Sequence, residues 1–204
     1  MARAKTAGAD GDQGDDLRTR ILTEAMLAIA ETGLSGLTMS ALARRLDTSG
    51  GHLLYYFGTK DRLLLEALRH SEGGLARERL ALTAGRGSPA RRLDRFMRLY
   101  LPTGARDPRW MLWIELWPRS GGDPALRDAQ RELDRAWESD LVTLLADGAE
   151  RGVFALPDPP ARAAQLLALL DGLSTRVLLG HDDLDRNGAI AAARSAASAL
   201  IPGA

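Results

Sequence analysis

Two short helix-forming segments, joined by a turn of a few residues, constrain the fold of this chain more than any other feature of its sequence. In the first segment, which begins near Thr38, apolar residues recur at i, i+3, i+4 and i+7 from Met39 to Leu46, a spacing that buries one face of a helix. Asp47 tolerates the left-handed conformation of a tight turn, and Ser49 is a good N-cap for the second segment. Helices this short need longer partners to be stable.

Longer amphipathic segments flank this pair on both sides. The pattern predicts a helix over about 17–31, which Gly33 ends, and another over about 60–82, which Thr59 caps. Two short helices joined by a turn, behind a longer support helix, form the helix-turn-helix motif, which places its second helix in the major groove of DNA. We therefore predict a helix-turn-helix domain over residues 17–63.

The rest of the chain follows a helical pattern as well. Ala, Leu, Arg and Glu dominate, β-branched residues are sparse, and no alternating strand pattern occurs. Predicted helices cover roughly 89–101, 108–118, 124–151, 159–179 and 188–201, and each break between them contains Pro or Gly. The sequence therefore predicts an all-α fold of about nine helices, in which residues 64–204 form a second, helical domain.

Composition narrows the classes of function. The 27 basic and 27 acidic residues give a net charge of zero, so any contact with DNA must depend on a local patch. The chain has no cysteine, and its apolar runs are too short to span a bilayer, so we expect a cytoplasmic protein without a membrane partner. Residues 1–16 are expected to form a disordered arm, whose Arg3 and Lys5 either stay in solvent or reach a minor groove.

The sequence lacks the usual constellations of catalytic residues. Its three histidines, His52, His70 and His181, lie in different segments. No nucleophile–His–acid set, phosphate-binding loop, dinucleotide fingerprint or metal-ligand cluster is present. We therefore expect neither an enzyme nor a bound cofactor or metal ion.

A specific pattern connects the two short segments to a known family. The segments Thr38–Arg45 and Ser49–Lys60 together resemble the second and third helices of TetR-family bacterial regulators and the entry to the fourth. The match combines a capped helix, a turn, a Ser-x-Gly start, an aromatic cluster and a Thr-Lys pair in one register. The segments Trp113–Trp117, Asp123–Arg127 and Leu169–Leu173 resemble the C-terminal domain of the BetI-like branch of that family.

Several residues of the helix-turn-helix are suited to contact DNA. Thr38 and Lys60 lie at helix N-termini, where a bound phosphate would offset the unfavourable position of the Lys60 cation. The family resemblance also implies a phosphate-contacting lysine at residue 60. Gly50 and Gly51 let the second short helix approach the groove closely, and His52 is its first long polar side chain.

Two adjacent pairs leave alternatives open. Tyr55 and Tyr56 point in different directions on a helix, so one can pack inward while the other presents its hydroxyl to a phosphate. Arg44 and Arg45 both follow the buried stripe; either at least one faces DNA or both are solvated. The expected DNA-binding set is Thr38, Arg44, Arg45, Ser49, Gly50, Gly51, His52, Tyr55, Tyr56 and Lys60.

Aromatic residues gather in the C-terminal domain. Trp110, Trp113 and Trp117 share one face of a short helix, and they line either an ordinary core or a ligand pocket. The family resemblance implies a pocket for a small-molecule effector. Glu115 lies on the side of its helix opposite to the tryptophans, so we do not expect it to anchor a cation. Asp171 either anchors the effector or only bonds a neighbour. The expected pocket set is Phe96, Met97, Tyr100, Trp110, Trp113, Trp117, Trp137 and Asp171.

The last two predicted helices carry apolar stripes suited to pairing. The resemblance implies that these helices from two subunits form a four-helix dimer interface. The expected interface set is Leu166, Leu170, Leu173, Val177, Ile190, Ala193, Ala197 and Leu200. A two-fold homodimer would bind a pseudo-palindromic double-stranded DNA operator.

These expectations combine into a sequence-specific transcriptional regulator. The leading hypothesis is a repressor that a small-molecule effector releases from its operator, because an effector that prefers one conformation shifts the equilibrium toward it. A constitutive or activating DNA-binding protein of the same fold is one alternative. A helical protein that binds a small molecule and has no role at DNA is another.

Overall fold

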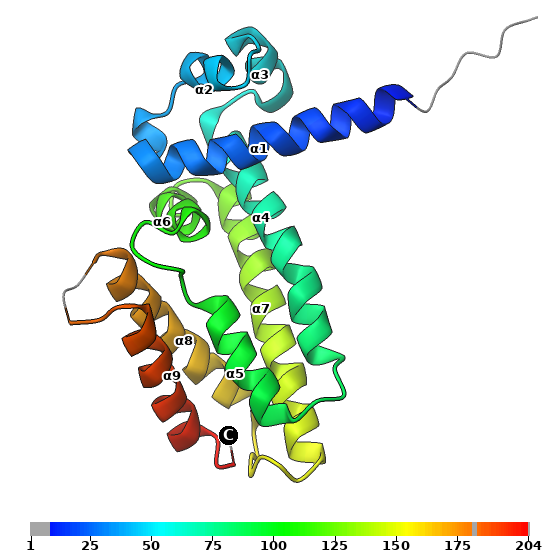
Figure 1. The fold of residues 1–204 in the computed structure, drawn as a ribbon, viewed down its shortest axis with the longest axis vertical. Coiled ribbons are helices and arrows are strands. Elements are labelled where there is room, and N and C mark those ends of the chain that lie inside the picture. The colour runs from blue at the N-terminus through cyan, green and yellow to red at the C-terminus, as the bar shows by residue number, and fades with distance from the viewer. Residues whose placement is uncertain (1–8, 181–182, 204) are drawn as a thin grey trace, which may run out of the picture.

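The computed structural model describes residues 9–180 and 183–203, and within these ranges the chain forms nine α-helices and no strand (Figure 1). The helices are α1 (Ala9–Gly36), α2 (Met39–Arg45), α3 (Gly50–Phe57), α4 (Lys60–Thr83), α5 (Pro89–Tyr100), α6 (Pro108–Ser120), α7 (Pro124–Glu150), α8 (Pro159–Leu178) and α9 (Arg186–Leu200). The predicted all-α fold is confirmed. Residues 1–8 of the expected arm, including Arg3 and Lys5, lie outside the described residues, as does His181.

Helix α1 differs clearly from its predicted bounds. It begins at Ala9 rather than near residue 17, so residues 9–16 of the expected arm are helical. Gly33 interrupts the helix with φ 71° and ψ 165°, and Leu37 N then donates to Gly33 O at 3.2 Å. Gly33 therefore interrupts α1 near its end, while a helical hydrogen bond still closes the turn that follows it.

Helices α1 to α3 and the first turns of α4 form the helix-turn-helix expected from the sequence, which we call the head. Their core contains Leu42, Leu53 and Phe57, which are buried against α1 and α4. Asp47 occupies the turn between α2 and α3 with φ 51°, as predicted for a residue that tolerates the left-handed region. Figure 1 shows α2 and α3 above α1, on the side away from the body.

The body is built on the two long helices α4 and α7, which pack against each other, with α5, α8 and α9 beside them (Figure 1). Phe96, Trp137, Leu144 and Leu170 belong to its buried core. Helix α4 is continuous, so the predicted domain boundary after residue 63 falls inside a helix that both parts share. Across 9–180 and 183–203, no helix has the length and apolar character needed to cross a membrane.

The stripes expected to form a dimer interface face the interior of the chain instead. Leu173 and Leu200 are only partly buried, but the other six predicted residues are buried in the body core: Leu166, Leu170, Val177, Ile190, Ala193 and Ala197. The prediction was wrong for these six residues because a helix at the edge of a bundle uses its apolar stripe to pack on its own chain. Any dimer contact of α8 and α9 must use their outer faces.

Candidate functional site

The outer face of α3 carries an exposed group of aromatic and polar side chains. His52 stacks on Tyr56 with ring centroids 4.9 Å apart, and Tyr55 lies edge-on to Tyr56 at 5.8 Å. Tyr55 is 87% exposed and Tyr56 45%, so neither ring packs inward as we expected for one of them. Leu53 and Phe57 fill the interior positions that turn this face outward. The helix thus presents its hydroxyl and imidazole groups away from the protein.

The N-terminal caps of α2 and α3 confirm the local predictions. Thr38 accepts a hydrogen bond from Ala41 N at 3.0 Å, and Ser49 accepts one from His52 N at 3.1 Å. A Cβ added at Gly50 would be in ordinary van der Waals contact with Ser40 of α2, 3.4 Å from its Oγ. Gly51 faces open space, with only Ser49 Oγ as near as 4.0 Å. At Gly51, therefore, the missing side chain leaves the surface of α3 open to close approach by another molecule.

The two adjacent arginines of α2 have different environments. Arg45 pairs with Glu24 at 3.1 Å and also with Glu31, so it fastens α2 to α1. Arg44 is exposed, and among the described residues its guanidinium has no hydrogen bond or ion pair. The guanidinium of Arg62, which sequence reasoning missed, is also exposed and has no partner in the described part of the chain. Arg44 and Arg62 are therefore the cations of this face available to an external anion.

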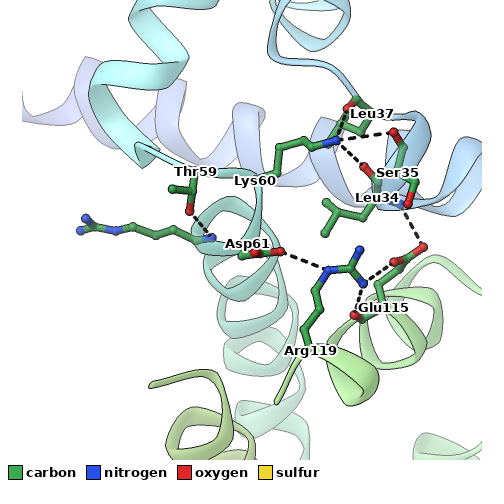
Figure 2. A network of polar contacts seen from close by, with 9 residues as sticks. Leu34, Ser35, Leu37, Thr59, Lys60, Asp61, Glu115 and Arg119 are labelled. Carbon is green, nitrogen blue, oxygen red and sulfur yellow. Dashed lines mark hydrogen bonds and ion pairs between the residues drawn. The ribbon is translucent and has the colours of Figure 1, made fainter. Parts of the chain in front are cut away.

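Lys60 does not match the prediction of a phosphate contact through its ammonium group. Figure 2 shows Lys60 Nζ at the broken end of α1, where it donates to Leu34 O and Leu37 O at 3.0 Å and to Ser35 O at 3.5 Å. Carbonyl oxygens at a helix C-terminus carry partial negative charge, so they supply the counter-charge that we had expected from a phosphate. Lys60 therefore joins α4 to α1.

Helix α6 contacts the same broken end of α1. Leu34 N donates to Glu115 Oε1 at 3.0 Å, and Arg119 donates to Glu115 Oε2 at 2.8 Å (Figure 2). Arg119 Nε also donates to Asp61 Oδ1 in the first turn of α4, at 3.1 Å. The expectation that Glu115 faces away from the tryptophans of its helix is confirmed. Its carboxylate receives the backbone N–H that the break at Gly33 leaves free.

The loop before α6 adds a further contact to α1. Arg106 has a left-handed backbone, with φ 58°, and its guanidinium donates to Ala30 O at 2.8 Å and to Glu31 O. The charged side chains of Lys60, Arg106 and Glu115 therefore bind backbone groups at the end of α1, where a helix leaves such groups without partners. We define the α1 clamp as Lys60, Arg106, Glu115 and Arg119. It joins the end of α1 to the start of α4 on one side and to α6 on the other.

A cavity of about 370 Å³ lies in the body between α4, α5, α6, α7 and α8. Six of the eight residues predicted for a pocket line it: Tyr100, Trp110, Trp113, Trp117, Trp137 and Asp171. Phe96 and Met97 do not. Phe96 is buried and packs edge-on behind Trp137, with centroids 5.4 Å apart, whereas Met97 faces a groove between α5 and α9. Of the three residues predicted from α5, only Tyr100 therefore lines the cavity.

The rings around the cavity form a continuous edge-to-face series. Trp117 meets Trp110 at 6.3 Å, Trp110 meets Tyr100 at 5.6 Å, and Tyr100 meets Trp137 at 4.9 Å, with interplanar angles of 71–80°. Edge-to-face contacts are the favoured geometry of aromatic pairs because they place a positive ring edge against a negative face. The ring faces not used in these contacts give the cavity walls an electron-rich character.

Carboxylates add negative charge to the same walls. Asp171 accepts a hydrogen bond from the Tyr100 hydroxyl at 2.5 Å, and Asp134 interacts weakly with the Gln130 amide at 3.4 Å. Burial raises the pKa of both aspartates, and the hydrogen bond from Tyr100 opposes the rise at Asp171. No basic side chain pairs with either carboxylate among the described residues. Unpaired charge beside aromatic faces suits a cationic ligand.

The lining residues that sequence reasoning missed come mainly from helices far apart in the chain. They are Glu72, Arg109, Gln130, Asp134, Glu138, Ala164, Leu167 and Ala168. Arg109 has its charge directed at the end of α5, where it donates to Leu99 O at 2.9 Å and Tyr100 O at 2.7 Å. Burial lowers the pKa of Arg109. In residues 9–180 and 183–203, no group of His, Cys, Asp and Glu side chains is arranged to hold a metal ion.

An exposed helix-turn-helix on an all-helical body with an aromatic cavity defines a helix-turn-helix DNA-binding regulator. Comparison with known proteins agrees. Residues 21–67 match the sequence model of the tetR family of bacterial regulatory proteins, and residues 89–202 match that of the C-terminal domain of BetI-type transcriptional repressors. The chain belongs to the TetR family, with a BetI-type C-terminal domain.

Individual relatives support the same assignment. The HTH-type transcriptional regulator BetI of Paraburkholderia phymatum is 31% identical over 181 residues, which cover 85% of this chain and 87% of that protein. A putative transcriptional regulator from Saccharomonospora viridis, solved in complex with choline, is 29% identical with a TM-score of 0.84 over 92% of this chain and 98% of its own. A putative TetR-family regulator from Rhodococcus is 25% identical with a TM-score of 0.74, covering 92% and 99% of the two chains.

Proposed function

We propose that this chain is a repressor that binds a pseudo-palindromic operator as a homodimer in the cytoplasm and leaves it when a small organic cation fills the body cavity. The observation that carries the proposal is the double role of α6. One face of this helix presents Trp110, Trp113 and Trp117 to the cavity. Another face presents Glu115 and Arg119 to the broken end of α1 and the start of α4.

The DNA contacts proposed for the head follow from exposure and from unpaired charge. Arg44 and Arg62 supply the cations for phosphate or base contacts, and the hydroxyls of Thr38 and Tyr55 supply further hydrogen-bonding groups. Gly51 allows α3 to enter the major groove, where His52 can hydrogen-bond to a base edge. Lys60 and Arg45 contribute indirectly, since both hold the head together.

A choline-like cation fits the chemistry of the cavity. Aromatic faces attract quaternary ammonium groups through their quadrupoles, and a desolvated contact contributes about 2 kcal/mol. Asp134 and Asp171 add two carboxylates without basic partners in the described structure. The volume of about 370 Å³ is within the range of small-ligand sites. The choline complex of the Saccharomonospora viridis relative makes choline the natural first probe.

The α1 clamp provides a physical route from the cavity to DNA. An effector that moves the tryptophans of α6 also moves Glu115, which holds Leu34 N, and Arg119, which holds Asp61 of α4. Leu37 is followed directly by Thr38, the cap of α2, so a displaced α1 end changes the direction of α2 and α3. Ligand and operator then oppose each other by the same free energy, because coupling between two sites is reciprocal.

The homodimer proposal uses the outer faces of α8 and α9 in place of the buried stripes. Gln165, Leu169, Gly172 and Leu173 share an exposed or partly exposed face of α8, and Ala191 lies on the exposed face of α9. Small side chains allow two helices to approach closely. We expect the wild-type chain to sediment as a dimer and Ala191→Glu to sediment as a monomer. A dimeric Ala191→Glu protein would show that this face is not the interface.

The central test joins both halves of the proposal. Duplexes bound by the protein are selected from random sequence, and the preferred duplex is then titrated with protein in the presence and absence of choline. We expect a palindromic site, a steep decrease of affinity with salt, and release by choline. Operator binding that no small cation alters would favour the constitutive or activating alternative. Binding without preference among duplexes would refute the regulator proposal.

The role of the clamp has its own variant. Glu115→Gln removes the carboxylate charge that Arg119 and Leu34 N share, while leaving every cavity-lining residue in place. We expect this variant to bind choline with unchanged affinity and to retain more of its operator affinity when choline is saturating. An unchanged response to choline would show that coupling does not pass through Glu115.

A further inference from the structure

Glu72 of α4 is a buried carboxylate placed between two cavity tryptophans. Its side chain is 2% exposed. Oε1 accepts the indole N–H of Trp113 from α6 at 3.0 Å, and Oε2 accepts the indole N–H of Trp137 from α7 at 2.8 Å. One carboxylate on α4 therefore fixes one ring from each of two other helices.

The charge of Glu72 is already compensated inside the protein. Arg79, about two helical turns further along α4, donates to Glu72 Oε2 at 3.3 Å and to Asp140 Oδ2 at 2.7 Å. The Arg79 guanidinium also lies 4.1 Å from the centroid of the Trp137 ring. Asp134 and Asp171 have no such basic partner in the described residues. Glu72 thus differs from the two aspartates, whose carboxylates are available to a cation.

A hydrogen bond to the indole nitrogen restricts rotation of the ring, because turning the ring would leave a buried donor and a buried carboxylate unsatisfied. Trp137 is further restricted by the edge-on contact with Tyr100 at 4.9 Å and by Arg79 on its face. The ring planes of Trp113 and Trp137 in the cavity wall therefore depend on Glu72. Rigid walls discriminate ligands by shape, whereas rotating rings adapt to several shapes.

We propose that Glu72 is a positioning residue of the effector pocket: by holding the indoles of Trp113 and Trp137, it makes the pocket select a trimethylated ammonium group over an unmethylated one. This inference rests on the proposed binding of an organic cation. The selectivity comes from the fixed distance between ring faces, which a bulky ammonium fills and a small hydrated one does not. Since Glu72 lies on α4, the same bonds also connect the ring positions to the helix that enters the head.

Glu72→Gln tests the proposal with little change of volume. A glutamine replaces one of the two acceptor oxygens with an NH₂ donor, so one of the two indole N–H groups loses the oxygen that it contacts. We expect one indole signal, from Trp113 or Trp137, to move in a ¹H–¹⁵N spectrum, while the signals of Trp110 and Trp117 stay in place. By calorimetry, we expect choline affinity to fall about tenfold, a loss of one typical hydrogen bond. We also expect the preference for choline over ethanolamine to shrink.

Asp140→Asn is the matched control. It removes the other acidic partner of Arg79 but leaves both indole bonds intact. We expect its indole signals and its preference for choline over ethanolamine to equal those of the wild type. If Asp140→Asn changes selectivity as much as Glu72→Gln, the effect belongs to the Arg79 ion pairs and the positioning role is refuted.

The wild-type protein gives an independent measurement if Glu72→Gln fails to fold. Trp113 and Trp137 indole hydrogens should exchange with solvent more slowly than that of Trp117, which has no hydrogen-bond partner in the described structure. Equal exchange at all of these indoles would overturn the inference. If Glu72→Gln binds choline with unchanged selectivity, the positioning role of Glu72 is refuted, but the proposed effector class is not. If the wild type fails to bind choline, both are refuted.

Discussion

The proposed DNA-binding surface and the proposed effector pocket are both built from aromatic and charged residues, but in opposite ways. On α3, residues within one short segment, such as His52 and Tyr55, are exposed and interact with their sequence neighbours. In the body, Glu72 of α4 and Trp137 of α7 are 65 residues apart in the sequence, yet they share a buried hydrogen bond of 2.8 Å. One surface comes from a single short helix, whereas the other is assembled from five helices.

This difference determines what a substitution does in each region. An exposed side chain such as Arg44 has few partners to lose, so its replacement should change binding and leave stability alone. A pocket residue such as Trp137 also belongs to the core of the body, so its replacement should change both. Substitution of a buried pocket residue should therefore change the stability of the body together with ligand binding.

Trp137→Ala should give the largest effect and sharpen this contrast. The ring is 5% exposed and packs on Phe96, Tyr100 and Arg79. We expect loss of measurable choline binding together with about 3–5 kcal/mol of the free energy of unfolding. Calorimetry and denaturant unfolding measure the two effects. A variant that loses choline but keeps its full stability would break the proposed link between pocket and core.

Arg44→Ala and Arg45→Ala form a matched pair of neighbours. Arg44 has no partner in the described residues, so we expect its removal to weaken operator binding by roughly 10- to 100-fold with an unchanged melting temperature. Arg45 pairs with Glu24 and Glu31, so its removal should lower the melting temperature of the head. Fluorescence anisotropy and thermal unfolding distinguish them. The reverse result would exchange the two assignments.

Lys60→Ala and Arg62→Ala test the correction at the start of α4. Removal of the Lys60 ammonium leaves three carbonyl oxygens without their donor, so we expect a loss of about 1–2 kcal/mol of unfolding free energy. Arg62→Ala should keep stability and reduce the slope of operator affinity against salt by about one unit. A reduced salt slope in a fully stable Lys60→Ala protein would restore the phosphate contact that the structure argues against.

The smallest expected effect is the pH dependence of effector binding. Burial raises the pKa of Asp134 and Asp171, and nearby Glu72 adds to the rise at Asp134, whereas the hydroxyl of Tyr100 opposes it at Asp171. A carboxylate attracts a cation only above its pKa, so choline affinity should be full at neutral pH and decrease as the pH falls through the raised pKa values. We expect a few-fold loss at a pH at which an ordinary aspartate is still ionised.

Direct calorimetry of choline binding measures this effect without any contribution from DNA binding. Asp171→Asn should flatten the dependence and weaken binding at neutral pH, because it removes one carboxylate and keeps a group that can accept the Tyr100 hydroxyl. A dependence of the same size in a protein with both Asp134→Asn and Asp171→Asn would show that other groups cause it.

The sequence predicted the helices well and the surfaces unevenly. Helix α5 was expected over 89–101 and occupies Pro89–Tyr100, because Pro and Gly mark helix ends through local backbone geometry alone. Thr38 and Ser49 were recognised as caps for the same reason. Which face of α8 and α9 turns inward was predicted wrongly, since an apolar stripe shows that a helix packs but not against what.

What the sequence determined by itself is therefore whatever neighbouring residues decide: the nine helices, their caps, the left-handed turn at Asp47 and the outward face of α3. Tertiary structure alone decided that the Lys60 ammonium binds the end of α1 and that Glu72 joins two tryptophans. Periodicity places a side chain on one side of its own helix, over a turn or two. Its partner across the core depends on how whole helices cross, and no local pattern in the chain encodes that crossing.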